Sequence, residues 1–318
     1  MITNDLEKAV QALVHNEIIA VPTETVYGLA GNAYNETALF KIFELKKRPL
    51  YNPLIVHIKS VSFLQQVAAD IPEIAIKLAE AFWPGSLTLI LNKKPHIPDM
   101  VTAGKDTVAI RVPNHPLTLE LLNLLDFPLA APSANPFGSI SPTSAQHVYN
   151  YFEDELGIIL DGGFCEKGIE STIIGFENNK PILYRHGSVV LEEIESLVGK
   201  VIVQTKNDSS PTAPGMLSSH YAPKTPTYFT NDVSGLIADF SDKKIGLLLY
   251  KNEITGENIL HQEILSKKGD LKEASKNLYA ALHRLDQSKP EVIIAERLPE
   301  SGLGKSINDR LQRAAVRF

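Results

Sequence analysis

Cysteine is almost absent from this sequence, and Cys165 is the only one among 318 residues. A single cysteine cannot form a disulfide within the chain, which excludes a disulfide-stabilised scaffold and favours a reducing compartment. The sequence also lacks any apolar run near the ~18 residues that a membrane-spanning helix needs. Its first residues do not show the basic-then-apolar order of a secretory signal. We therefore expect a cytoplasmic protein with no membrane segment.

Basic residues are scarce in the first two thirds of the chain. Up to Val203 there are 15 Lys and Arg residues against 23 Asp and Glu residues, a balance of −8. From Gln204 onward there are 16 against 14, a balance of +2. Neither part has the basic excess that is typical of a nucleic-acid-binding domain. We expect direct binding of nucleic acid to be weak or absent.

The order of the predicted elements indicates an α/β protein with two domains. Residues 1–203 alternate helix-like segments with short buried strands, and the first helix has capping-box spacing from Asn4 to Glu7. The alternation has no strict βαβ rhythm, so we expect a twisted sheet that is mixed or mostly parallel. Residues 204–227 are polar and rich in proline, as a linker is. Residues 228–318 predict a small three-layer, Rossmann-like α/β domain.

Polar residues follow several of the predicted strands. Thr23 and Thr25 come directly after the strand at residues 18–21, and His57 and Arg111 close two further strands. Strand ends of α/β sheets commonly line a ligand crevice, and an arginine fork there matches a carboxylate. Capping threonines, a structural histidine and an ordinary salt bridge are the alternatives, and these residues alone do not decide between them.

A basic cluster at Lys46, Lys47 and Arg48 closes a predicted helix, because Pro49 disfavours helical geometry at the residue before it. One interpretation is polyphosphate binding, since lysine and arginine suit phosphate oxygens. The other is favourable charge at a helix C-terminus. Residues 131–143 combine small hydroxyl and amide side chains ahead of another helix, which suits an anion and ribose site or an ordinary turn.

Together these motifs resemble the YrdC-like threonylcarbamoyl-AMP synthase family in its long form, which has an added C-terminal domain. The matching segments are PTETVYGL at 22–29, KKRP and NPLIVH within 46–57, PGSLTLIL at 84–91, AIRVP at 109–113, APSAN and SPT within 131–143, GIEST at 168–172 and YRHG at 184–187. The added domain matches through PGM and SHYAP within 214–223 and GLGKSINDRLQRAA at 302–315. Residues 217–219 depart from the more basic or aromatic stretch that many members carry there.

The resemblance implies an enzyme that converts L-threonine, bicarbonate and ATP into L-threonylcarbamoyl-AMP and pyrophosphate. This is the first step in the threonylcarbamoyl modification of adenosine 37 in tRNA, and it implies downstream proteins that transfer the product to tRNA. A deep cavity in the sheet and Mg²⁺ on the ATP phosphates are also implied. The reaction needs no protein nucleophile, which suits a sequence without a convincing Ser-His-Asp or Cys-His set. We find no carboxylate cluster for a metal held by the protein.

The resemblance also assigns residues by position. For ATP it implies Lys46, Arg48, Asn52, Thr107, Ser133, Asn135, Ser141 and Arg185. For L-threonine it implies Thr25, His57, Arg111, the Ala131 backbone and Ser171, with Arg111 on the carboxylate. His220 and Tyr221 lie side by side in the linker, and we expect them to reach the phosphates from a lid over the cavity. Packing on the second domain is the alternative for these two residues.

Two other function classes remain open. Related domains have been proposed to bind double-stranded RNA, but the acidic balance of the first domain argues against an RNA-binding or tRNA-binding module as the main role. A carbamoyltransferase-type domain would act on carbamoyl phosphate, and such relatives carry zinc-finger segments that one cysteine cannot supply. Dependence on ATP in the presence of threonine separates this last alternative from the synthase.

Overall fold

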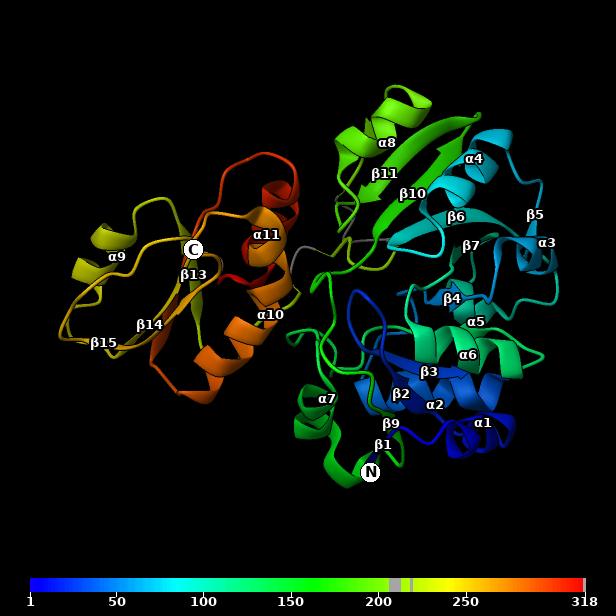
Figure 1. The fold of residues 1–318 in the computed structure, drawn as a ribbon, viewed down its shortest axis with the longest axis horizontal. Coiled ribbons are helices and arrows are strands. Elements are labelled where there is room, and N and C mark those ends of the chain that lie inside the picture. Colours follow the sequence, from blue (N-terminus) through cyan, green and yellow to red (C-terminus); the bar gives the residue numbers. More distant parts are fainter. Residues whose placement is uncertain (206–212, 218–219, 317–318) are drawn as a thin grey trace.

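The protein has two lobes, which Figure 1 shows side by side in the computed structural model. The structure describes residues 1–205, 213–217 and 220–316, so residues 206–212 and 218–219 of the predicted linker lie outside the described residues. The larger lobe is built on a 12-stranded sheet and the smaller on a 4-stranded sheet. No helix within the described ranges is long and apolar enough to cross a membrane.

Both lobes consist of short helices and strands. The helices of the larger lobe are α1 (Leu6–Val14), α2 (Glu36–Lys46), α3 (Leu64–Val67), α4 (Glu73–Phe82), α5 (Asp99–Thr102), α6 (Pro116–Leu124), α7 (Ala145–Phe152) and α8 (Leu191–Val198), with 3₁₀ turns at Val61–Phe63 and Glu153–Glu155. Its strands are β1 (Ile2–Thr3), β2 (Ile19–Val21), β3 (Gly28–Asn32), β4 (Ile55–His57), β5 (Ala68–Ala69), β6 (Leu87–Lys93), β7 (Thr107–Arg111), β8 (Leu129–Ala130), β9 (Ile159–Leu160), β10 (Thr172–Glu177), β11 (Lys180–Arg185) and β12 (Ile202–Val203). The smaller lobe contains β13 (Thr227–Thr230), α9 (Val233–Asp239), β14 (Ile245–Leu249), β15 (Ile259–Ile264), α10 (Leu271–Gln287), β16 (Val292–Glu296) and α11 (Leu303–Ala314).

The large sheet runs in the order β1-β9-β2-β3-β8-β4-β7-β6-β10-β11-β12, with β5 beside β6. It mixes parallel pairs such as β4 with β7 and antiparallel pairs such as β6 with β7. The prediction of a mixed α/β sheet is therefore confirmed. In the β4–β7 pair, His57 lies directly opposite Arg111 at the end of the ladder. Two of the strand ends that carry polar residues in the sequence thus lie side by side.

Local sequence signals set several element boundaries. Asn35 caps α2, because its side chain accepts a hydrogen bond from the Ala38 N–H, and Lys47 ends the helix in the left-handed region with φ 52°. At α1 the expected cap at Asn4 is wrong by one residue. Asp5 is the N-cap, and its carboxylate accepts from the Lys8 N–H.

Some elements were not predicted because tertiary contacts form them. Strand β3 has the sequence GLAGN, and glycine weakens a strand signal. Pairing with β2 and β8 nevertheless makes it a central strand. An added Cβ at Gly31 would lie 3.2 Å from the side chains of Ile18 and Ile42, so the close approach of helix α2 requires a small residue.

The smaller lobe is a three-layer unit, as the sequence predicts. Its sheet has the order β13-β16-β14-β15, and all its pairs are parallel. Leu247 and Leu249 of β14 pack in a cluster with Val233 of α9, whereas Leu248 packs with residues of α10 and α11. Successive residues of a strand face opposite sides, so α9 covers one face of the sheet and the two longer helices cover the other.

Helices α10 and α11 lie on the side of the smaller lobe that faces the larger lobe (Figure 1). Ile140 and Ile169 of the larger lobe belong to the same apolar cluster as Leu278 of α10. The Ser306 hydroxyl of α11 donates to the Gly187 carbonyl. The two lobes therefore share buried apolar packing. Helices α10 and α11 contact the loops of the larger lobe that carry Ile140, Ile169 and Gly187.

Candidate functional site

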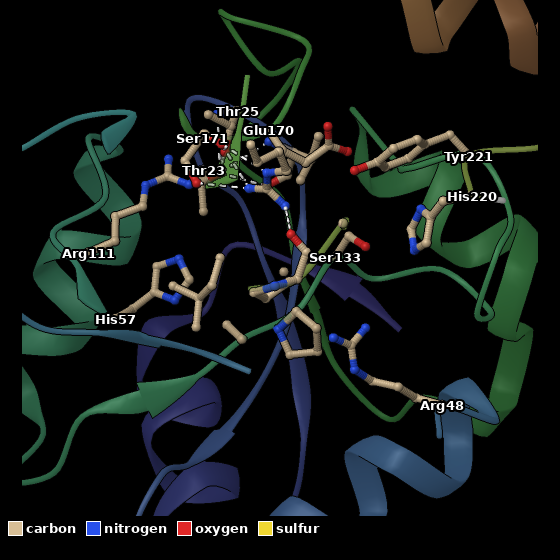
Figure 2. A pocket seen from close by; sticks show the side chains of 18 residues that line it. Thr23, Thr25, Arg48, His57, Arg111, Ser133, Glu170, Ser171, His220 and Tyr221 are labelled. Atoms are coloured by element: carbon tan, nitrogen blue, oxygen red, sulfur yellow. Dashed lines mark hydrogen bonds between the residues drawn. The ribbon is translucent and has the colours of Figure 1, made fainter. Parts of the chain in front are cut away.

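A small cavity lies where strands β4 and β7 of the larger lobe end, and Figure 2 shows the 18 side chains that line it. It encloses about 60 Å³. Its walls come from the segments that follow β2 and β8, the ends of β4, β7 and β11, the loop before β10, and the predicted linker. The cavity gathers these predicted ligands: Thr25, Arg48, His57, Arg111, Ala131, Ser133, Ser171, Arg185, His220 and Tyr221.

Arg111 and His57 lie on one side of the cavity (Figure 2). The Arg111 guanidinium donates to Glu24 Oε1 at 2.6 Å and, from Nε, to the Gly85 carbonyl at 3.0 Å. Both charged side chains are buried. Arg111 therefore forms the salt bridge that the sequence offered as an alternative to ligand binding. The same side chain also lines the cavity. A carboxylate ligand at Arg111 would join an ion pair that already exists.

Glu24 does not line the cavity but pairs with Arg111 next to it, and sequence reasoning missed this residue. It accepts from the Ser86 hydroxyl at 2.8 Å and from the Asn114 N–H at 2.9 Å, in addition to Arg111. Burial would raise the pKa of Glu24, but Arg111 and these donors hold that pKa below its usual value. The available signal was a charged residue inside the otherwise uncharged PTETVYGL motif, since a buried charge needs a partner. Glu24 fixes the orientation of Arg111.

The His57 imidazole is neutral at physiological pH. Burial lowers the pKa of His57 to about 3, and the neighbouring Arg111 adds to this effect. Its Nδ1 atom is buried and has no hydrogen-bond partner among the described residues. The ring is therefore available for a hydrogen bond to a ligand beside Arg111.

Arg48 lies on the opposite side of the cavity from Arg111 (Figure 2). Its guanidinium donates only to backbone carbonyls, of Asn52 at 3.1 Å and Pro53 at 2.8 Å, among the contacts of the described residues. Burial lowers the pKa of Arg48 to about 9, which leaves the side chain charged at neutral pH. A buried cation with only carbonyl partners favours an anionic ligand.

Arg185 forms a third basic element of the wall. It donates to the Ser171 carbonyl at 2.9 Å, to the Ser171 hydroxyl at 3.0 Å and to the Pro214 carbonyl at 3.2 Å. The Ser171 hydroxyl is also 2.7 Å from the Thr88 hydroxyl. Burial lowers the pKa of Arg185. Arg185 thus joins the loop before β10 to the linker at the edge of the cavity.

Five of the residues predicted for ATP do not line the cavity, and they are Lys46, Asn52, Thr107, Asn135 and Ser141. Lys46 lies behind the wall, where its ammonium donates to the carbonyls of Ser133 and Asn135 at 2.5 Å each. Burial lowers the pKa of Lys46 well below its usual value, and Arg48 adds to this effect. In this arrangement Lys46 supports the loop that carries Ser133.

The other outlying residues differ in their surroundings. The Ser141 hydroxyl donates to Glu170 Oε1 at 2.7 Å, and Glu170 itself lines the cavity. Thr107 lies in a separate surface depression beside Tyr184. A nucleotide that contacts Thr107 would have to extend past the cavity, so the assignment of Thr107 stays a prediction.

The described part of the linker covers one side of the cavity. Met216 packs in an apolar cluster with Ile55 and Tyr184 of the large sheet. Tyr221 is buried with φ 66°, a left-handed conformation that is strained for a tyrosine. The His220 N–H donates to the Arg313 carbonyl of α11 at 3.0 Å. The linker is therefore held on the sheet from one side and by the smaller lobe from the other.

Several unpaired buried polar atoms belong to residues that line this cavity or lie on loops beside it. Within the described residues these include both amide atoms of Asn52, Oδ1 of Asn135, Nδ1 of His57 and Nδ1 of His220. Buried polar atoms in proteins are nearly always hydrogen-bonded. The unpaired atoms of His57 and His220, which line the cavity, are therefore available to a polar ligand.

The carboxylates at the cavity are already engaged by arginines. Glu24 pairs with Arg111, and Glu170 pairs with Arg310 of α11 at 3.1 Å. The part of the chain that the structure describes contains no group of three or more His, Cys, Asp and Glu side chains that would hold a metal ion. A divalent cation at this site would need to bring other ligands, as Mg²⁺ does when it binds phosphates and water.

Comparison with known proteins decides the family. Residues 11–187 match a family model described as "Telomere recombination", and residues 189–316 match one described as "Threonylcarbamoyl-AMP synthase, C-terminal domain". The chain belongs to the threonylcarbamoyl-AMP synthase family. The resemblance seen in the motifs, including the added C-terminal domain, is therefore confirmed.

Full-length relatives support this assignment. The chain is 39% identical to the threonylcarbamoyl-AMP synthase of Bacillus subtilis, over 98% of this chain and 94% of that protein. It is 41% identical to the enzyme of Pyrococcus abyssi, over 94% and 90%. A crystal structure of P. abyssi Sua5 with L-threonine covers 98% of this chain with a TM-score of 0.91 at 40% identity.

Proposed function

We propose that this protein makes L-threonylcarbamoyl-AMP and pyrophosphate from L-threonine, bicarbonate and ATP. The proposal rests on one observation, a cavity whose two sides are lined by different basic side chains. Arg111 and His57 lie on one side, where an amino acid would place its carboxylate. Arg48 and Arg185 line other parts of the wall, where phosphates would bind, and within the described residues their hydrogen bonds go to backbone carbonyls and the Ser171 hydroxyl.

The reaction requires positioning rather than a protein nucleophile. The threonine amine attacks bicarbonate, water leaves, and a carbamate forms. A carbamate oxygen then forms a bond to the α-phosphorus while the bond to the bridging oxygen breaks and pyrophosphate leaves. Binding both substrates on opposite walls of one cavity would hold the carbamate and the α-phosphate close together, so that they react as neighbouring groups. Arg48 and Arg185 would stabilise the charge that develops on the phosphates.

Mg²⁺ is proposed to enter with ATP. Hard cations prefer oxygen ligands, and Mg²⁺ commonly keeps several waters beside substrate phosphates. The engagement of Glu24 and Glu170 by arginines supports this assignment, because neither carboxylate is free to serve as a ligand. When bound, Mg²⁺ would neutralise phosphate charge, and the basic side chains would share that role.

The linker is proposed to act as a lid. A cavity of about 60 Å³ is far smaller than the roughly 300–1,000 Å³ of sites for ligands of nucleotide size. Pro214, Gly215, His220 and Tyr221 form part of its wall, so we expect them to move when ATP enters. Closure over the bound substrates would exclude water from the carbamate and the adenylate. His220 and Tyr221 would then approach the phosphates.

The product is proposed to pass to proteins that transfer the threonylcarbamoyl group to tRNA in the cytoplasm. We propose weak or no direct tRNA binding by the chain itself, because the first 203 residues carry an acidic balance. Tight, steeply salt-dependent binding of bare tRNA would contradict this part.

Pyrophosphate release from ATP tests the proposed reaction. We expect release that requires both L-threonine and bicarbonate, with L-threonylcarbamoyl-AMP as the product detected by mass spectrometry. Omission of either substrate gives the matched controls. Pyrophosphate release without threonine would contradict the proposal, as would turnover of carbamoyl phosphate with no need for ATP and threonine.

A further inference from the structure

Glu170 is a buried carboxylate at the boundary between the two lobes. It comes from the loop before β10 in the larger lobe, lines the cavity and is 6% exposed. Its partners come from three segments. The Ser141 hydroxyl donates to Oε1 at 2.7 Å, the Tyr279 hydroxyl of α10 lies 2.9 Å from both oxygens, and Arg310 of α11 donates to Oε2 at 3.1 Å.

This arrangement argues against Glu170 as a general base. Burial would raise the pKa of Glu170, but the Arg310 and Arg185 guanidiniums and the Ser141 hydroxyl together hold that pKa below its usual value. Both carboxylate oxygens already accept hydrogen bonds. A carboxylate that is stabilised in its charged form and saturated with donors takes up protons poorly. Its contacts suit holding other groups in place.

The shortest contact of Arg310 among the described residues is the one with Glu170, at 3.1 Å. Arg310 is 0% exposed, and its other contacts are longer, 3.4 Å to the Ser306 carbonyl and 3.4 Å to Asp309. Its guanidinium also lies over the Tyr221 ring of the linker, 5.6 Å from the centroid. Glu170 points toward Tyr221 across the same part of the cavity (Figure 2). Arg310 therefore contacts both the linker and Glu170.

We propose that Glu170 is a positioning residue through which the C-terminal lobe fixes the Ser141 hydroxyl for the nucleotide. Arg310 compensates the charge of Glu170, Tyr279 orients its carboxylate, and the carboxylate orients Ser141. This inference rests on the proposed function and on the nucleotide role that the resemblance implies for Ser141. It adds that two residues of the C-terminal lobe contribute to ATP affinity without touching ATP.

Tyr279→Phe is the sharpest test, because it removes one hydroxyl and leaves all charges in place. We expect the ATP dissociation constant and the KM for ATP to rise about five- to tenfold, the effect of one lost hydrogen bond. The KM for threonine should stay unchanged. In the Ser141→Ala background, Tyr279→Phe should weaken ATP binding by less than about twofold, since the hydroxyl that it positions is gone.

Tyr250→Phe is the matched control. Tyr250 also belongs to the C-terminal lobe, and its hydroxyl donates to the Gly269 carbonyl, away from the cavity. We expect it to leave ATP binding unchanged. Arg310→Lys keeps the positive charge and should weaken ATP binding less than Arg310→Met does.

Calorimetric titration of the full chain with ATP separates the outcomes. Tyr279→Phe and Ser141→Ala each change the ATP dissociation constant by some factor. If these two factors multiply in the double variant, the positioning role is overturned. An unchanged ATP affinity with lowered thermal stability in Tyr279→Phe would also overturn it. Wild-type protein that binds ATP but shows no threonine-dependent turnover would contradict the proposed function alone. Wild-type protein that binds no ATP would contradict both.

Discussion

Arg48 and Arg310 are both buried arginines, but Arg48 lines the cavity of the larger lobe, whereas Arg310 lies in a helix of the smaller lobe. Arg48 donates only to carbonyls of its own loop among the described residues. Arg310 pairs with Glu170 and Asp309. The comparison shows that burial of a cation does not reveal its role. The hydrogen-bond partners of the cation indicate its role, because a buried charge without a counter-charge favours binding of an oppositely charged ligand.

Arg111 is intermediate between these two. It has a buried carboxylate partner, Glu24, and it also lines the cavity. A substrate carboxylate that binds there would make a second interaction with a guanidinium that is already oriented. Orientation in advance reduces the ordering cost of binding.

The largest effect is expected from Arg310→Met. It leaves Glu170 as a buried carboxylate without its ion-pair partner, which should lower the free energy of unfolding by about 3–5 kcal/mol. Chemical denaturation measures this loss. The double variant Arg310→Met with Glu170→Gln removes both charges and should recover a large part of it. Equal stability of Arg310→Met and the wild type would contradict the structural assignment of Arg310.

Arg111→Ala is expected to weaken threonine binding roughly 100-fold, because a charge-assisted pair with the carboxylate is lost. The KM for ATP should change far less. Because Glu24 loses its partner, stability falls as well, so the companion variant Arg111→Met with Glu24→Gln is needed. This companion should regain stability but not threonine affinity. An equal loss for both substrates would assign Arg111 a structural role.

Arg48→Met is expected to weaken ATP binding by about 2 kcal/mol, roughly 30-fold, while the free energy of unfolding changes little. The reason is that Arg48 has no carboxylate to leave unpaired. Isothermal titration with ATP measures the affinity. Arg297→Met serves as control, since Arg297 pairs with Glu300 in the smaller lobe outside the cavity. Unchanged ATP affinity in folded Arg48→Met would remove the phosphate assignment.

The smallest expected effect per residue is the pH dependence of stability. Burial lowers the pKa values of His57, His220 and His283 to about 3 in the folded chain, against ~6.5 when unfolded. Below pH 6.5 the unfolded chain therefore binds more protons, and stability falls as the pH drops from 6.5 toward 3. Each histidine should cost on the order of 1 kcal/mol at pH 5.5. Denaturation at pH 7.5 and 5.5 measures this loss, and His283→Gln should reduce it. A pH-independent stability would contradict the burial of these rings as neutral groups.

The sequence alone determined the family, the mixed α/β class and many helix and strand positions. The motifs are local, and alternation of apolar and polar residues reports which face of an element is buried. The sequence also placed His57 and Arg111 at the ends of strands. The parallel register of β4 and β7 brings these two residues together. Arg48 and Lys46 appeared equivalent in the sequence. Helix α2 ends between them, so one side chain lines the cavity and the other supports a loop.

Only the tertiary structure decided which charges are paired. Glu24 lies 87 positions from Arg111 along the chain, and Glu170 lies 140 positions from Arg310. No local pattern links such residues, because the sheet order and the packing of the two lobes set their distance. Strand β3 was missed for the same reason, since its glycines form a strand only between two partners. The free energy of a buried charge depends on its neighbours in space, and those exist only after the chain has folded.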